Sequence, residues 1–247
     1  MRILIGGLLN CCSGNGSAPA PNLLDSLLPP LPLDIVPAAY VNSHTLWYFA
    51  DPMCSWCWGF APVIDAIKAH YGDGLKIALV LGGLRPGTTE PLAPETRAEI
   101  LHHWHEVQRR TGQPFAFEGA LPEGFVYDTE PPSRAVIAIS GLNPEATLPF
   151  FKRIQATFYA EGRDVTQPDT LAALAETFDI APAQFHPAFA SSEAIEVTRR
   201  HFEHTRRAGV TGFPTTVLQH GEKLELLNSG YRAFDDLKPQ IESWLSS

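Results

Sequence analysis

The stretch D-P-M-C-S-W-C-W-G-F at residues 51–60 decides the fold of this chain, because it sets two cysteines three positions apart at the end of an apolar segment. That segment, T-L-W-Y-F-A at 45–50, is rich in aromatic residues and predicts a buried strand. Apolar positions at helical spacing predict a helix over 54–70, in which we expect Pro62 to bend the helix or to start a new segment. Residues 75–81 predict a second strand, so the fold begins with a βαβ unit whose strands run parallel.

The remaining chain divides into a helical block and a returning pair of strands. Helices are expected over 94–112, 131–140, 144–160, 169–178 and 191–208. An antiparallel strand pair is expected at 215–219 and 223–227, followed by an amphipathic helix over 234–245. The inward positions of that last helix are Leu237, Ile241, Trp244 and Leu245. The predicted fold class is α/β, with a β-α-β and β-β-α mixed sheet and an all-helical insertion.

Composition excludes several classes of protein. The net charge of −9 argues against a nucleic-acid binder, which usually carries a basic surface. No run approaches the roughly 18 consecutive apolar residues of a membrane span. Four cysteines are too few for a disulfide scaffold, and Cys11 and Cys12 lie outside the predicted fold, so one C-x-x-C pair stands alone within it.

The first 43 residues predict an N-terminal extension. A short apolar run with one basic residue precedes Cys11 and Cys12, and Gly/Ser/Ala/Pro-rich and Leu/Pro-rich stretches follow. One interpretation is a secretory or lipoprotein signal, and the other is an extension outside the fold. The second is favoured because the basic region is minimal and Asn10 is a poor residue before a lipidation cysteine. A cytoplasmic location is accordingly favoured, and an extracytoplasmic one stays open if residues 1–40 include a signal.

Cys54 follows a strand and opens a helix, and this position predicts a nucleophile. The first amides of a helix lack internal partners and carry partial positive charge, which stabilises a thiolate. Cys57 lies one turn later, where it can attack the Cys54 sulfur and release a bound substrate. Ser55 and Trp56, between them, are expected to contact the substrate and to tune the redox potential.

Two other interpretations of the cysteine pair stay open, a structural disulfide and half of a zinc site. Zinc needs two further ligands. The histidines and the glutamate that share helical faces supply candidates: His102, His105, Glu106, His201 and His204. The strand-then-helix context favours redox chemistry over both alternatives, with no bound metal.

A second candidate element is G-V-T-G-F-P-T at 209–215. A proline directly before a strand and after a glycine-containing loop is a candidate for a cis peptide bond. Such a bond would expose the backbone of Phe213 to an extended substrate. An ordinary trans Pro214 at a strand start is the alternative.

Taken together, these features resemble the DsbA-like family of thioredoxin-fold proteins, in the branch of FrnE-type oxidoreductases and predicted protein-disulfide isomerases. The segments that carry the resemblance are 51–60, 82–87 (G-G-L-R-P-G), 127–136 (Y-D-T-E-P-P-S-R-A-V), 155–165 (Q-A-T-F-Y-A-E-G-R-D-V) and 209–215. The resemblance implies that Cys54 is the attacking thiol, Cys57 the buried resolving thiol and Pro214 a cis-proline packed against them. It also implies a thioredoxin-like domain from 44–90 and 208–247, with 91–207 as a helical cap.

Some relatives carry an acid six residues before the first cysteine, where this chain has Tyr48. Proton transfer to Cys57 then falls to Asp51 or to water, and Asp51 as a turn residue capping local amides is an equal alternative. An apolar collar round the thiols is expected from Trp56, Trp58, Phe60, Phe213 and Tyr231. Arg85 is a candidate to bind a carboxylate such as that of glutathione, with a surface salt bridge as the alternative.

The favoured function is thiol–disulfide exchange with protein or small-molecule thiol and disulfide substrates. It needs no cofactor, and glutathione is a candidate redox partner. The alternative is a glutathione-dependent transferase or isomerase similar to the kappa class, against which the two intact cysteines argue. A non-catalytic metal-binding or peptide-binding module is the third hypothesis.

Overall fold

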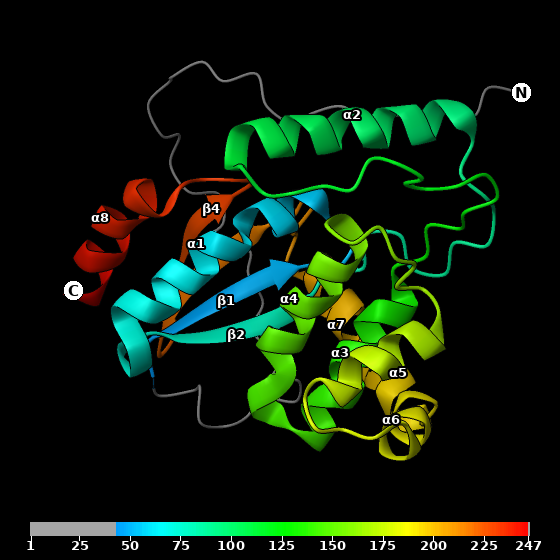
Figure 1. Cartoon of the computed structure of the whole chain (residues 1–247). Coiled ribbons are helices and arrows are strands. Elements are labelled where there is room, and N and C mark those ends of the chain that lie inside the picture. Colours follow the sequence, from blue (N-terminus) through cyan, green and yellow to red (C-terminus); the bar gives the residue numbers. More distant parts are fainter. Residues whose placement is uncertain (1–42, 247) are drawn as a thin grey trace, which may run out of the picture.

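A four-stranded mixed sheet lies at the centre of residues 43–246, the part of the chain that the computed structural model describes (Figure 1). The strand order is β2-β1-β3-β4, with β1 at Thr45–Ala50, β2 at Lys76–Leu81, β3 at Thr215–His220 and β4 at Lys223–Ser229. β1 runs parallel to β2 and antiparallel to β3, which pairs antiparallel with β4. The predicted βαβ unit and strand pair are confirmed, whereas the predicted N-terminal extension lies, but for residue 43, outside the described residues.

β1 is buried along its whole length because both of its faces are covered. Leu46, Tyr48 and Ala50 belong to the larger apolar core, and Trp47 and Phe49 to a second, smaller one. Alternate side chains of a strand point to opposite faces, so a strand between two apolar layers reads as a continuous apolar run.

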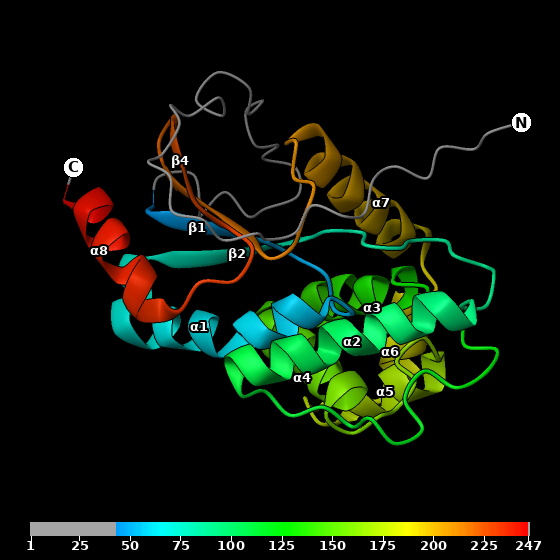
Figure 2. The same cartoon turned by 90° about the horizontal axis from the view of Figure 1, so that it is seen from above.

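α1 (Ser55–Tyr71) covers one face of the sheet, beside α8 (Phe234–Leu245) (Figure 2). α1 runs through Pro62, so of the two outcomes expected there the start of a new segment does not occur. Proline has no N–H to donate to the carbonyl four residues earlier, that of Trp58. The Gln113 side-chain amide donates to that carbonyl instead, at 2.9 Å, so the oxygen keeps a partner. On α8, Leu237, Ile241 and Trp244 are buried as predicted, and Leu245 is half-buried.

α7 (Ser192–Arg207) lies on the opposite face of the sheet (Figure 2). The Leu81 amide donates to His201 Nδ1 at 3.2 Å, and the Thr205 hydroxyl donates to the Leu81 carbonyl at 3.0 Å. The ring of Phe49 stacks on that of His204, with centroids 6.0 Å apart. The predicted boundary between the helical insertion and the thioredoxin-like domain, at residues 207 and 208, stays a prediction. These contacts favour assigning α7 to the same unit as the sheet.

The predicted insertion, 91–207, contains five helices before α7: α2 (Pro94–Thr111), α3 (Glu130–Leu142), α4 (Thr147–Tyr159), α5 (Pro168–Glu176) and α6 (Pro182–Phe189). α6 was not expected from the sequence, because it is eight residues long and contains a second proline, Pro187. The helix expected from residue 144 begins as a separate 3-10 turn at Pro144–Ala146. None of the helices within 43–246 is long and apolar enough to cross a membrane.

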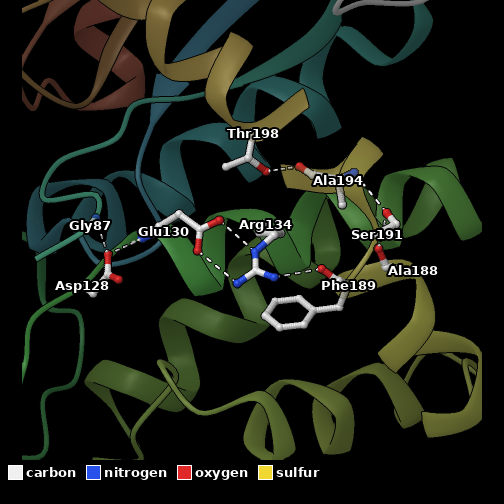
Figure 3. Close-up of polar contacts among 9 residues, drawn as sticks. All are labelled: Gly87, Asp128, Glu130, Arg134, Ala188, Phe189, Ser191, Ala194 and Thr198. Carbon is white, nitrogen blue, oxygen red and sulfur yellow. Dashed lines mark hydrogen bonds and ion pairs between the residues drawn. The ribbon is translucent and has the colours of Figure 1, made fainter. Parts of the chain in front are cut away.

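Side chains at the start of α3 tie the insertion together (Figure 3). Arg134 pairs with Glu130 one turn earlier and donates to the Phe189 carbonyl at the end of α6. The guanidinium also lies 4.0 Å from the centroid of the Phe189 ring. Asp128 accepts from the amides of Gly87 and Glu130, which joins the loop after β2 to α3.

Gly59 sets the distance between α1 and α2, which suggests a test of their packing. A Cβ atom on Gly59 would lie 2.9 Å from both Val107 Cγ1 and Thr111 Cγ2, closer than packed side chains allow. Gly59→Ala should lower the free energy of unfolding by about 1–2 kcal/mol, because the cost of overpacking exceeds the gain in helix propensity. Gly141→Ala is the matched control, since Gly141 is helical and has open space around it. Equal stabilisation of both variants in urea unfolding would contradict this packing.

Candidate active site

Cys54 is the N-cap residue of α1, directly after β1. Its backbone is extended, its amide donates to the Asp51 carbonyl at 3.1 Å, and its carbonyl accepts from the Trp58 amide at 3.0 Å. The residue is 7% exposed, whereas Cys57, one turn further, is fully buried. Both are free cysteines, so the structure represents the dithiol. The two thiols therefore differ in access: only Cys54 retains any contact with solvent.

The loop before β3 meets Cys54 from the far end of the chain. The Phe213–Pro214 peptide bond is cis. The Cys54 thiol donates to the Phe213 carbonyl at 3.6 Å. The Phe213 ring lies so close over Gly82 that a Cβ there would come within 2.3 Å of it. The fold thus brings together the ends of β1 and β2 and the start of β3 around one sulfur.

Cys57 lies in apolar surroundings, in which its thiol stays protonated. Burial, and then the neighbouring Cys54, raise the pKa of the Cys57 thiol, and a backbone hydrogen bond from Asp51 opposes the rise. Tyr48 is a further neighbour: burial and the two cysteines raise its pKa, so the phenol stays protonated. Its hydroxyl is buried without a hydrogen-bond partner of normal geometry in the described chain. From the sequence, Tyr48 is only the position where some relatives carry an acid, although strand alternation with Leu46 and Ala50 places its side chain on the α1 face.

Asp51 makes the hydrogen bonds of a capping residue. Its Oδ1 accepts from the Met53 amide at 2.9 Å and its Oδ2 from the Leu84 amide at 2.8 Å. The carboxyl group is fully buried, and burial raises its pKa to about 6 against the opposing effect of these bonds. Asp51 therefore joins the start of α1 to the loop after β2, and its role in proton transfer stays a prediction.

Two tyrosines of the helical insertion, which sequence reasoning missed, lie beneath the site. The Tyr127 hydroxyl donates to the Met53 carbonyl at 2.5 Å and lies 3.4 Å from the Tyr159 hydroxyl. The Tyr159 ring stacks on Trp58, with centroids 6.4 Å apart. Both tyrosines lie in segments that carry the family resemblance, 127–136 and 155–165. Membership of these segments is the sequence feature that could have identified them. The insertion thus supports the residue that precedes Cys54.

The expected aromatic collar divides into two groups. Phe60 is fully buried and Trp58 nearly so, and both are core residues. Trp56, Phe213 and Tyr231 are half-buried. Ser55, the other residue between the cysteines, is half-buried as well.

Arg85 lies with its guanidinium 5.7 Å from the centroid of the Tyr127 ring. Within residues 43–246 no acidic side chain pairs with it, so the surface salt bridge that was its alternative role does not form there. The candidate role of Arg85 in carboxylate binding stays a prediction.

The histidine clusters do not assemble a metal site with the cysteines. Over the described stretch, no three histidine, cysteine, aspartate or glutamate side chains gather closely enough to hold a metal ion. His105 stacks on Phe117, with centroids 3.9 Å apart, and His201 accepts the hydrogen bond from Leu81. The zinc tetrads considered from the sequence are therefore not formed.

The sheet, the helical insertion and the cysteine pair at the start of α1 define a thioredoxin-fold protein. The chain belongs to the DsbA-like thioredoxin domain family, whose profile matches residues 45–242. It is 46% identical to a candidate protein disulfide isomerase from Nitrosomonas europaea, covering 83% of this chain and 98% of that one with a TM-score of 0.79. It is 31% identical to the cytosolic disulfide reductase DsbM from Pseudomonas aeruginosa, covering 82% and 98% of the two chains with a TM-score of 0.69.

A more distant relative is the ClpXP adapter protein SpxH of Halalkalibacterium halodurans, 23% identical over 176 residues. That match covers 70% of this chain and 57% of the relative, so the chain spans less than two thirds of that protein. These comparisons confirm the family and the thioredoxin fold expected from the sequence.

The contact between Gly82 and the Phe213 ring is open to a direct test. Gly82→Ala should displace the ring and move the Phe213 carbonyl away from Cys54. We expect a loss of about 1–3 kcal/mol in unfolding free energy and a fall of about tenfold or more in disulfide-exchange rate. Gly212→Ala, which directly precedes Phe213 and has open space around its Cβ, is the control. Equal rates for the two variants in an insulin-reduction assay would contradict the proposed importance of this contact.

The buried Asp51 should make stability depend on pH. Its pKa of about 6 lies above the ordinary value near 3.9, so the folded state binds more protons between these values. The contribution of Asp51 to stability should therefore fall as pH rises from about 4 to 6, by about 3 kcal/mol. Urea unfolding across this range should show a downward slope that is smaller in Asp51→Asn. Identical slopes for the two proteins would refute the raised pKa.

Proposed function

We propose that this protein catalyses thiol–disulfide exchange, with Cys54 as the nucleophile and Cys57 as the resolving thiol. The observation that carries the proposal is the unequal exposure of two free thiols at the start of one helix, the outer one facing the carbonyl of a cis Phe213–Pro214 bond. A sulfur at this position lies at the electropositive end of α1, which favours the thiolate.

In the exchange, the Cys54 thiolate attacks one sulfur of a substrate disulfide. A Cys54–substrate disulfide forms, and the other half of the substrate leaves as a thiolate. Cys57 then loses its proton and attacks Cys54 Sγ, which forms the Cys54–Cys57 disulfide and releases the second thiolate. Two electrons pass from the dithiol to the substrate, and the reverse sequence oxidises a substrate dithiol.

The second step depends on the removal of a proton from the buried Cys57. Asp51 lies near enough for its charge to act on Cys57, and its pKa of about 6 suits a proton acceptor at neutral pH. Because both Asp51 oxygens accept backbone amides, transfer through a water molecule fits this geometry better than direct contact. The protonated Tyr48 phenol, a buried neighbour of Cys57, is the proposed donor of a hydrogen bond to the Cys57 thiolate once it forms.

The proposed substrates are protein or small-molecule thiols and disulfides, with glutathione as the redox partner. DsbM from Pseudomonas aeruginosa, 31% identical to this chain, has also been solved with GSH. In the substrate-binding surface we include Ser55, Trp56 and Phe213, which flank Cys54 or face it and are half-buried. The glutathione-dependent transferase is less favoured, because that activity needs no resolving thiol, whereas this chain retains one in Cys57.

Substitution of each cysteine should separate the two steps. Cys54→Ser should abolish insulin reduction, because Cys57, the other cysteine of the described chain, is fully buried and out of reach of a protein disulfide. Cys57→Ser should perform only the first step and accumulate a mixed disulfide with substrate, visible by mass spectrometry under non-reducing conditions. Residual turnover in Cys54→Ser at the wild-type rate, or trapping through Cys57 in that variant, would refute the assignment.

A further inference from the structure

Arg110, in the last turn of α2, lies over Trp56, which stands between the two cysteines. Its guanidinium carbon is 5.6 Å from the centroid of the Trp56 ring and 5.6 Å from that of Tyr231. The two rings are themselves 6.2 Å apart. Since Trp56 stands between Cys54 and Cys57, the guanidinium is fixed next to the reactive centre by cation–π contacts on two rings.

The α1–α2 contact holds this arrangement rigidly. Gly59 leaves room for Val107 and Thr111, so the end of α2 lies directly against the first turns of α1. The Trp58 indole N–H donates to the Pro114 carbonyl at 3.0 Å, and Gln113 donates to the Trp58 carbonyl at 2.9 Å. Three independent contacts thus fix the segment that carries Arg110.

The Arg110 guanidinium has no anionic partner in the described part of the chain. No hydrogen bond or ion pair engages it there, although Glu106 stands one turn earlier on the same helix. A basic residue in the last helical turn also complements the helix dipole. Arg109 and Arg110 are both exposed in that turn and meet that need equally well, so the dipole does not explain why Arg110 packs on two aromatic rings.

We propose that Arg110 is a substrate-binding residue that accepts the carboxylate of a small thiol or disulfide, and thereby selects anionic small-molecule partners. This proposal rests on the thiol–disulfide exchange proposed above. Both rings lie to one side of the guanidinium, because their centroids are only 6.2 Å from each other and 5.6 Å from its carbon. Its N–H groups match the two oxygens of a carboxylate. A short peptide thiol with a free carboxylate beside its cysteine, as in glutathione, presents both groups together.

In the reducing direction the electrons balance with two such thiols. The first thiolate attacks Cys54 Sγ of the oxidised protein, forms a mixed disulfide and releases Cys57, which takes up a proton. The second thiolate attacks the substrate sulfur of that mixed disulfide, which forms the small-molecule disulfide and releases the Cys54 thiolate. Arg110 takes no part in these bonds; it holds the carboxylate while the sulfurs exchange.

The test compares glutathione with its dimethyl ester, in which the carboxylates are neutralised. Rates of reduction of the oxidised protein are followed by fluorescence of the tryptophans beside the pair, and each rate is divided by that with mercaptoethanol in the same variant. The ratio of glutathione to ester should fall about tenfold in Arg110→Met, which keeps the aliphatic stem but loses the charged hydrogen bonds. The ratio for Arg110→Lys should lie between those of the wild type and Arg110→Met, and the ratio for Arg109→Met should equal that of the wild type.

The outcomes separate the two proposals. If no thiol reduces the wild-type protein, thiol–disulfide exchange itself is refuted. If every thiol reduces it but the ratio is equal in wild type and Arg110→Met, only the carboxylate site is overturned. An equal fall in Arg109→Met would also overturn it, because general electrostatic attraction would then account for the preference.

Discussion

The contact between the start of α1 and the Phe213–Pro214 loop is the constraint on which the rest of the structure depends. It joins the Cys54 thiol to the Phe213 carbonyl, 159 positions further along the chain. The intervening chain folds so that both groups lie at the same end of the sheet. β1 delivers Cys54 and β3 follows Pro214, and these two strands are paired directly. The antiparallel pairing of β1 with β3 thus fixes the distance that a thiol–disulfide exchange centre needs.

Burial then makes the two sulfurs different. Cys54 keeps slight access to solvent at the helix end, and Cys57 lies in the core with Tyr48 and Asp51 as its polar neighbours. Burial raises the pKa of Cys57, so in the proposed exchange this thiol stays protonated until the mixed disulfide has formed. A difference in burial between neighbouring turns of one helix therefore orders the two proposed steps.

The helical insertion contributes to the site through backbone and ring contacts. Tyr127 fixes the carbonyl of Met53, and the end of α2 is bound to Trp58 by two hydrogen bonds. These contacts place Tyr127 against the residue before Cys54, and Arg110 beside Trp56. The sheet and α1 carry the two cysteines, and in the proposed exchange the insertion would form one side of the substrate-binding surface.

The sequence by itself determined the strand–helix–strand unit, the cysteine pair at the helix start and the final β-β-α segment, because these signals are local in spacing and periodicity. It could not reveal α6, whose eight residues are too few for a periodic pattern. It also could not show that α1 runs through Pro62, because Gln113, which donates to the carbonyl that Pro62 leaves without a helical partner, lies far along the chain. Only the tertiary structure decided which aromatic residues are core, where Tyr48, Tyr127 and Tyr159 lie, and that Arg110 stands beside Trp56. Those facts depend on helices and strands meeting across long sequence separations, where local pattern carries no information.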